Sequence, residues 1–217
     1  MTSLFKIEHG VSGIYFVRPT LFGDDRNVCF FRCNLLRMKT EAHQASVVIT
    51  EASPEDAEAL ERLINSAYRG PSALKGWTTE ALLIDGTRTD AQLIREIIDD
   101  PSSLLLKAVD VTGIVGCVEL QKQGERLYLG MLTVKPDLQG RGIGKELMRA
   151  SENVALSRNC HTIFMTVLTV RTELVAWYTR HGYYDTGERK PFAFTDPRFG
   201  KPKIPLEFAV LEKRLTS

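Results

Sequence analysis

The feature that most constrains this chain is a glycine-rich turn placed directly after an apolar, strand-like run. Residues 127–134 are mostly apolar, and the turn that follows carries three glycines, Gly140, Gly142 and Gly144. A turn of this kind, when it opens a helix, exposes several backbone N–H groups that bind an anion. Because glycine has no Cβ, the backbone can approach the ligand closely. The segment therefore predicts a strand–turn–helix unit that binds phosphate or diphosphate.

The spacing of the glycines separates this turn from two common nucleotide-binding loops. A P-loop has four residues between its glycines and a Ser or Thr after its Lys. Here three residues separate Gly140 from Gly144, and Glu146 follows Lys145. The dinucleotide fingerprint needs a third glycine where this chain has Lys145. A nucleotide-binding domain that uses this turn is therefore a remote alternative.

Composition and charge exclude several classes of partner. The chain has 217 residues, of which 43% are hydrophobic, so it can bury the core of one domain with an extension or of two small domains. A net charge of +1 gives no basis for electrostatic binding to nucleic acid or to an anionic membrane. No apolar run approaches the roughly 20 residues that cross a bilayer. We therefore expect no nucleic-acid partner and no membrane partner.

The cysteines and histidines give no sign of a metal site. None of the 4 cysteines forms a Cys-x-x-Cys pair, and the 4 histidines are scattered along the chain. Thiols without a secretion signal are typical of a reducing compartment. We therefore expect free thiols, no metal and a cytoplasmic location.

The chain divides into two segments of different character. Residues 1–45 mix aromatic residues, arginines and short apolar stretches without a sustained period. From residue 46 the pattern becomes regular. We therefore expect residues 1–45 to be an N-terminal extension of unclear role and residues 46–217 to form the functional domain.

Periodicity predicts an ordered series of elements in the second segment. The expected order is a strand, two helices, an antiparallel meander of three strands, the glycine turn with its helix, a strand in parallel pairing, a last helix and two closing strands. A polar connection over residues 77–90 links the first two helices. The expected strands are residues 47–49, 103–109, 114–121, 127–134, 162–168, 183–187 and 206–213, and the helices start near Pro54, Asp90, Ile143 and Thr172.

This order resembles that of the GNAT superfamily of acyl-CoA-dependent N-acyltransferases, over roughly Val47 to Leu215. Gln139-x-x-Gly142-x-Gly144 resembles the superfamily's pyrophosphate loop, and the segment from Tyr178 to Tyr183 resembles its Tyr-x-x-x-Gly-aromatic element. The resemblance implies a fold of the α/β (α+β) class. In that fold a mixed, mostly antiparallel central sheet is flanked by helices and carries a strand–glycine loop–helix site for CoA.

The resemblance also implies acetyl-CoA as the co-substrate and a way of holding it. The strand before the glycine turn separates from its parallel neighbour, and its backbone groups bind the pantetheine arm, while the turn holds the pyrophosphate. Carried onto this sequence, these donor-binding positions are Leu132, Thr133, Val134, Gln139, Gly140, Arg141, Gly142, Ile143, Gly144 and Lys145.

Acyl transfer to an amine needs a proton donor for the thiolate and a proton acceptor for the amine. By resemblance Tyr178 is the general acid, and a phenol is suitable because its reference pKa of about 10 keeps it protonated at neutral pH. The general base is not inherited, because Tyr128 and Thr166 occupy the positions where relatives carry Glu. Glu119 is the nearest carboxylate candidate for the base. The alternatives are that Glu119 is a solvent-facing strand residue and that a chain of waters takes the proton from the amine.

The acceptor pocket of this fold is built by the early helices, their connection and the last strands. Trp77 and Glu80 lie in that connection, and Arg171 stands where relatives carry Asn. Glu80 would suit a cationic group, whereas Arg171, and Arg88 in the same way, would favour an acidic group on the acceptor. We therefore expect Trp77, Glu80 and Arg171 to bind the acceptor, which an amino acid or a peptide-like amine would suit.

These observations lead to one expected activity and one alternative from a different class. The expected activity is transfer of an acetyl group from acetyl-CoA to a primary amine of a small molecule, amino acid or peptide by direct attack. Cys117 and Cys160 are expected to be buried, which argues against a covalent acyl-enzyme. The alternative is a non-catalytic acyl-CoA-binding module, because the usual family carboxylates are missing. A homodimer is left open.

Overall fold

The computed structural model describes residues 47–192 and 200–216. The expected extension of residues 1–45 and its boundary lie outside these residues. The helices are η1 (Pro54–Asp56), α2 (Ala57–Tyr68), α3 (Gly70–Ala73), α4 (Ala91–Asp99), η2 (Pro136–Leu138), α5 (Ile143–Ser157) and α6 (Thr172–Arg180). The strands are β1 (Val48–Glu51), β2 (Ile84–Asp85), β3 (Ser103–Asp110), β4 (Gly113–Gln123), β5 (Arg126–Val134), β6 (Thr162–Leu168), β7 (Tyr184–Pro191), β8 (Lys201–Pro202) and β9 (Glu207–Arg214).

A seven-stranded sheet in the order β1-β3-β4-β5-β6-β9-β7 forms the centre of the fold. Every neighbouring pair in it is antiparallel except β5 and β6, which are parallel. The predicted meander, the parallel pair after the glycine turn and the closing strand pair are all confirmed. The predicted fold class, a mixed and mostly antiparallel sheet flanked by helices, is confirmed with them.

Helices cover both faces of the sheet. The apolar faces of α5 and α6 pack with β3, β4, β5, β6 and β9 into one core cluster, in which Leu147 and Ile163 are fully buried. On the other face α2 and α4 pack against Leu105, Cys117 and Met131 in a second cluster. Two sheet faces covered by amphipathic helices give the layered architecture that buries one apolar stripe per helix.

Local capping sets where the helices start. The Asp56 carboxylate accepts a hydrogen bond of 2.8 Å from the Ser53 backbone N–H, so the chain turns into α2 as the Ser-Pro pattern predicts. The Asp90 carboxylate accepts from the Leu93 N–H at 2.8 Å and caps α4. None of the helices among the described residues is both long and apolar enough to cross a bilayer.

Two small elements depart from the sequence-based expectation. The connection over residues 77–90 contains β2, which pairs with β8 although the pattern predicts only a polar loop. Two-residue strands carry no periodicity, so their pairing is visible only in three dimensions. Gly70 and Pro71 end α2 as predicted, and Pro71 then occupies the first turn of the short α3.

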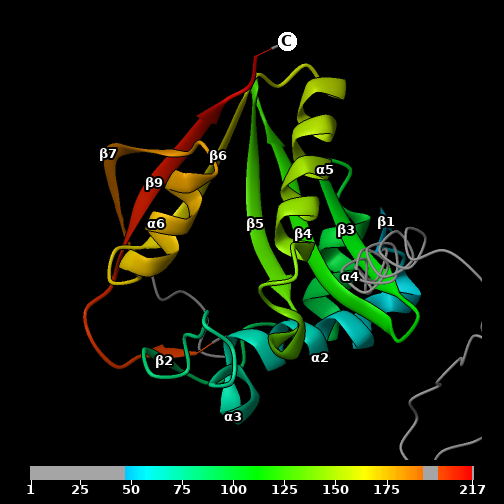
Figure 1. Cartoon of the computed structure of the whole chain (residues 1–217), viewed down its shortest axis with the longest axis vertical. Helices are drawn as coiled ribbons and strands as arrows, with labels where there is room; N and C mark the ends of the chain where they lie inside the picture. The colour runs from blue at the N-terminus through cyan, green and yellow to red at the C-terminus, as the bar shows by residue number, and fades with distance from the viewer. Residues whose placement is uncertain (1–46, 193–199, 217) are drawn as a thin grey trace, which may run out of the picture. The chain divides into compact units, whose positions relative to one another are not determined.

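The sheet opens between β5 and β6, and this opening positions the site. The two strands pair only from Arg126 to Tyr128 with Thr162 to Phe164. Beyond Tyr128 they separate, and Figure 1 shows β5 and β6 diverging from the end where they meet. The register of β4 and β5 shifts between Cys117 and Glu119, opposite Met131, which has a φ of 44°. Such a bulge bends the strand and leaves the far half of β5 with a free edge facing the opening.

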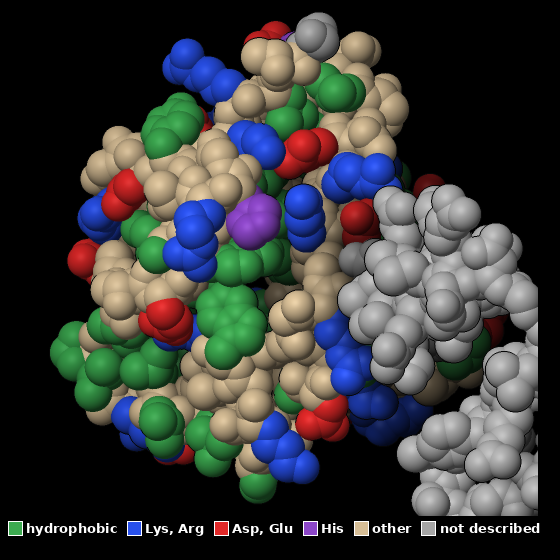
Figure 2. Space-filling view, viewed as in Figure 1, with side chains coloured by type: hydrophobic (Ala, Val, Ile, Leu, Met, Phe, Trp, Pro, Cys, Tyr) green, Lys and Arg blue, Asp and Glu red, His purple; other side chains and the backbone are tan. Residues whose placement is uncertain are grey.

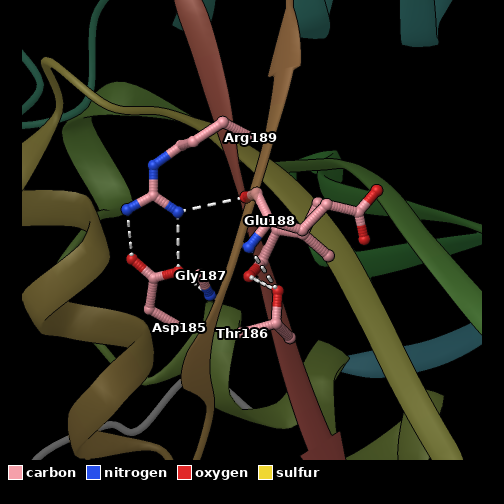
Figure 3. Close-up of polar contacts among 6 residues, drawn as sticks. Asp185, Thr186, Gly187, Glu188 and Arg189 are labelled. Atoms are coloured by element: carbon pink, nitrogen blue, oxygen red, sulfur yellow. Dashed lines mark hydrogen bonds and ion pairs between the residues drawn. The ribbon is translucent and has the colours of Figure 1, made fainter.

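The exposed strand β7 forms one edge of the sheet. Its register against β9 shifts between Asp185 and Arg189, and every residue of the strand is exposed. The Arg189 guanidinium donates to both carboxylate oxygens of Asp185 at 2.8 and 2.9 Å, and Figure 3 shows these two side chains facing each other across the bulge. A charged, bulged edge of this kind disfavours further strand addition.

Candidate functional site

Two cavities lie in the opening between β5 and β6, and the larger one follows the glycine turn. This first cavity has a volume of about 480 Å³ and runs between the turn, the start of α5 and the face of α6. On the face drawn in Figure 2, hydrophobic side chains and a histidine surround a central hollow, with cationic side chains on both sides. Its lining comprises Tyr68, Trp77, Thr78, Leu132, Val134, Leu138, Gln139, Gly140, Gly142, Ile143, Gly144, Lys145, Arg171, Glu173, Leu174, Trp177, Tyr178, Arg180 and His181.

Most of the predicted donor-binding residues line this cavity. Two do not: Thr133 is buried, with its hydroxyl donating to the Met131 carbonyl at 2.8 Å, and Arg141 is exposed outside the lining. Trp77, predicted to bind the acceptor, lines this cavity rather than the other one. Thr133 is buried while Leu132 and Val134 line the cavity, because neighbouring side chains of a strand point to opposite faces.

The turn itself has the geometry of an anion site. Gly142 is the N-cap residue of α5 and has a φ of 87°, a conformation that residues with a Cβ rarely adopt. The first N–H groups of a helix have no intrahelical acceptor, so those of α5 point toward the end of the cavity that Gly142 and Gly144 line. Lys145 and Arg180 add positive charge to the lining.

Gln139 connects the glycine turn to the segment that carries Trp77. Its side-chain Oε1 accepts from the Trp77 backbone N–H at 3.0 Å. Its Nε2 donates to the Val134 carbonyl at 3.3 Å and to the Thr78 hydroxyl at 3.4 Å. Gly76 leaves room for this arrangement, since a Cβ there would lie 2.8 Å from Oε1 of Gln139. The Gln139 side chain is therefore engaged with protein groups on both walls of the cavity.

Replacing Gln139 with Ala should weaken binding of acetyl-CoA by a factor of about three to ten, which corresponds to the loss of one or two hydrogen bonds. The reason is indirect, because the Trp77 segment loses its connection to the turn. Calorimetric titration gives the affinity, and hydrogen exchange at the Trp77 amide should become faster. Gln123→Ala, on the exposed end of β4, is the matched control. Unchanged exchange at Trp77 would contradict the connecting role.

The second cavity lies deeper in the opening and has a volume of about 300 Å³, at the lower end of the range for small-ligand sites. It is built by α2, the connection over residues 80–88, β5, β6, the start of α6 and the residues around β8 and β9. Its lining comprises Tyr68, Arg69, Glu80, Ile84, Arg88, Tyr128, Leu129, Gly130, Met131, Leu132, Met165, Thr166, Val167, Leu168, Arg171, Leu174, Tyr178, Phe192, Gly200 and Phe208.

Five residues line both cavities and mark where they meet: Tyr68, Leu132, Arg171, Leu174 and Tyr178. The Tyr68 hydroxyl donates to the Leu132 carbonyl at 3.2 Å, on the part of β5 that has left β6. Two ligands, one in each cavity, would therefore come together beside Tyr178.

Tyr178 is buried in the aromatic core of α6. Its ring lies 5.0 Å from that of Trp177 and 5.7 Å from that of Tyr183, measured between centroids. Burial raises the pKa of Tyr178 well above its ordinary value of 10.0. The phenol is therefore protonated at neutral pH, in a side chain that lines both cavities.

Glu119 lies on β4 directly opposite Gly130, which lines the second cavity, whereas Glu119 itself is in the lining of neither cavity. A Cβ at Gly130 would lie 3.0 Å from the Glu119 Oε2 and 2.9 Å from the Tyr128 ring, so the carboxylate packs where that side chain would be. Burial raises the pKa of Glu119 above its ordinary value of 4.5, and the charge of nearby Arg88 offsets part of the shift. Tyr128 and Thr166 face each other across the gap, with hydroxyl oxygens 3.4 Å apart.

The second cavity contains more residues than sequence reasoning can assign. Glu80 and Arg171, which are expected to bind the acceptor, lie in its wall, and sequence reasoning missed Tyr68, Arg69 and Phe208. Arg69 follows a helix end, where an arginine is normally solvated, yet it is only 7% exposed. The signal that was available is the unusual position of Tyr68 and Arg69 immediately before Gly70-Pro71, where α2 ends against the opening.

Comparison with known proteins agrees with this geometry. The model of the Acetyltransferase (GNAT) family matches residues 58–183. Thialysine N-epsilon-acetyltransferase from Sus scrofa is 28% identical over 149 residues, which cover 66% of this chain and 88% of the pig protein.

Solved structures share the fold at lower identity. Ribosomal-protein-S18-alanine N-acetyltransferase from Escherichia coli superposes with a TM-score of 0.58 at 12% identity, covering 79% of this chain and 96% of that chain. PaiA N-acetyltransferase from Thermoplasma acidophilum, in complex with coenzyme A, superposes with a TM-score of 0.56 at 17% identity, covering 78% of this chain and 99% of that chain.

Proposed function

Because this chain belongs to the GNAT family of acetyltransferases, we propose that it transfers an acetyl group from acetyl-CoA to a primary amine of a small molecule, amino acid or peptide by direct attack. The observation that carries the proposal is the meeting of two cavities beside Tyr178. One cavity ends at an anion-binding turn, and the other is small and polar. A donor and an acceptor can therefore occupy separate sites and react at their junction.

The first cavity suits coenzyme A in chemistry and in shape. The N–H groups at the start of α5, with Lys145 beside them, would bind the diphosphate. On the edge of β5 that has left β6, the carbonyls of Leu132 and Val134 already accept from Tyr68 and Gln139. The N–H groups of these two residues would pair with the carbonyls of the pantetheine arm as a neighbouring strand would. The thioester would then reach the junction at Tyr178.

Tyr178 is proposed as the general acid. When the amine attacks the thioester carbon, the C–S bond breaks and the sulfur leaves as a thiolate, which the Tyr178 hydroxyl would protonate. Burial raises the pKa of the Tyr178 phenol, and the same burial penalises a charged thiolate, so the proton transfer is not opposed by the surroundings. The side chain is accessible to both ligands because it lines both cavities.

Glu119 is proposed as the proton acceptor for the amine. Its raised pKa brings the carboxylate closer to the range in which it can take a proton at neutral pH. Tyr128 and Thr166 line the second cavity with hydroxyl oxygens 3.4 Å apart, and we propose that they carry the proton from the amine toward Glu119. Cys117 is an unsuitable nucleophile, because burial raises the pKa of its thiol to about 12. A buried, protonated Cys117 thiol supports direct attack of the amine on the thioester rather than a covalent acyl-enzyme.

Incubation with acetyl-CoA and a mixed library of primary amines tests the proposal. Mass spectrometry should find acetylated amines, and thiol release should depend on the amine. Binding of acetyl-CoA without thiol release on any amine would overturn the proposal and would favour a non-catalytic acyl-CoA-binding module. Titration with acetyl-CoA that produces no heat would overturn it at the donor site.

Replacing Glu119 with Gln should lower kcat/KM by about tenfold, because solvent can take part of the role of the base. The limb of the pH profile that reports deprotonation of Glu119 should disappear. The same change should raise the melting temperature at neutral pH. Because the pKa of Glu119 is higher in the folded state than its ordinary value of 4.5, the free energy of unfolding falls as pH rises from 4.5 through the folded-state pKa. Gln cannot ionise, so the variant avoids this loss of stability. The increase in melting temperature should vanish when the pH is below the ordinary pKa of 4.5.

The matched control is Glu125→Gln, in the exposed turn between β4 and β5. It should change neither the pH profile nor the melting temperature. A lower melting temperature for Glu119→Gln, with an unchanged pH profile, would assign Glu119 a structural role instead.

A further inference from the structure

Three arginines from separate parts of the chain line the second cavity. Arg69 ends α2, Arg88 lies in the connection before α4, and Arg171 precedes α6. Among the described residues in the lining, Glu80 is the one carboxylate. A small cavity with several guanidinium groups is expected to attract an anion.

The arginines differ in how far their donors are already used. Arg69 uses both terminal nitrogens, because it pairs with Glu80 at 3.1 Å and donates to the Ile84 carbonyl at 3.0 Å, and only its Nε has no partner among the described residues. Arg171 pairs through Nε with the Oε1 of Glu173 at 2.5 Å.

Within the described residues, the Nη2 nitrogen of the Arg171 guanidinium remains without an acceptor. Arg171 is only 6% exposed, and its Nη2 has no hydrogen-bond partner among the described residues. A buried donor without an acceptor carries a desolvation penalty, so an acceptor oxygen supplied by a ligand would be favourable there. The Glu173 pair fixes the guanidinium in this orientation.

Arg88 supplies a second cation to this cavity. Its guanidinium lies 5.5 Å from the centroid of the Tyr68 ring. It forms no ion pair within the described part of the chain. Tyr68 and Arg171 line both cavities, so the cation beside the Tyr68 ring and Arg171 border the same space.

We propose that the acceptor amine carries a carboxylate, and that Arg88 and Arg171 bind it in the second cavity. The inference deepens the proposed function and rests on it. It names amino-acid-like acceptors as the substrate class and disfavours polyamines, whose second cation would meet the two guanidinium groups. A carboxylate on the acyl group of the donor is the other source of the same chemistry. The position of Arg88 favours a carboxylate on the acceptor, because Arg88 lines the second cavity and not the first.

The test is a set of matched acceptors that differ only in the carboxylate. The set pairs lysine, glycine and glycylglycine with their C-terminal amides, and it includes cadaverine and putrescine. With acetyl-CoA, kcat/KM for the best free acid should exceed that of its amide by on the order of tenfold, as expected for one charge-assisted pair. Equal values for acids and amides would overturn the inference and leave the proposed function standing. No turnover with any amine would reject both.

Variants connect the preference to the residues. In Arg88→Met the acid-to-amide ratio should fall toward one through a higher KM for the acid, and Arg88→Lys should keep part of the ratio. Arg149→Met, on the exposed side of α5, is the matched control and should keep the full ratio. A full ratio in Arg88→Met, with unchanged melting behaviour, would overturn the assignment of Arg88.

A second comparison separates the two sources of carboxylate. Succinyl-CoA and propionyl-CoA are compared as donors, with a C-terminal amide that lacks a carboxylate as the acceptor. The wild-type protein should not prefer succinyl-CoA. A preference for succinyl-CoA that Arg171→Gln abolishes would place the carboxylate on the donor and overturn the inference.

Discussion

Replacing Tyr178 with Phe is expected to lower kcat by about 100- to 1,000-fold, the range typical of a lost general acid, while the Kd for acetyl-CoA changes by less than twofold. The substitution removes the hydroxyl that faces the junction of the two cavities and keeps the ring between Trp177 and Tyr183. Because the ring keeps its contacts with Trp177 and Tyr183, loss of the hydroxyl should not disturb the fold. Donor binding depends on the turn and on β5, which the variant leaves intact.

Steady-state kinetics with a saturating amine gives kcat, and calorimetric titration gives the Kd. Tyr183→Phe is a close control, because its ring is also buried and its hydroxyl has no partner among the described residues, yet it lines neither cavity. It should keep kcat and should not lower stability, since it removes a buried unsatisfied group. Equal kcat for Tyr178→Phe and wild type would remove Tyr178 from the acid role. Equal losses in both variants would assign the effect to packing.

The sequence predicts the main elements of this fold because their signals are local. The apolar run before the turn and the alternating helix faces each lie within one segment, and the glycines between them mark the connection. The parallel pairing of β5 with β6 follows from the strand–helix–strand order. The opening between these strands does not follow, because both continue as apolar runs past Tyr128 and Phe164, where pairing ends. The separation depends on the bulge at Met131 and on what packs between the strands.

The candidate site shows the same division between local and distant signals. The glycine turn and Tyr178 belong to contiguous motifs, and the structure brings both to the first cavity. The second cavity combines side chains more than 100 residues apart, such as Tyr68 and Phe208, and no local pattern announces such a contact. Trp77 illustrates the difference. Its segment is expected beside the acceptor, and in the structure it lies beside the glycine turn, where the Trp77 N–H donates to the Gln139 side chain and Gln139 donates to Thr78.

Replacing Gly142 with Ala is expected to weaken acetyl-CoA binding by about 10- to 100-fold, which corresponds to one or two lost charge-assisted hydrogen bonds. Gly142 has a φ of 87° at the N-cap of α5. Ala would cost about 1 kcal/mol in this conformation, and the turn would relax. A relaxed turn no longer directs the N–H groups of Ile143 and Gly144 toward one point.

The matched control is Gly124→Ala, because Gly124 also has a positive φ, 63°, and a Cβ at either glycine meets no atom within 4 Å. Both variants should therefore lose a similar amount of stability, and only Gly142→Ala should lose donor affinity. S-acetylpantetheine, which lacks the diphosphate, makes the comparison sharper. Its use as a donor should be the same in wild type and in Gly142→Ala, because the turn has nothing to hold. If Gly142→Ala impaired both donors equally, the turn would not be the diphosphate site, and the first cavity would need a different ligand.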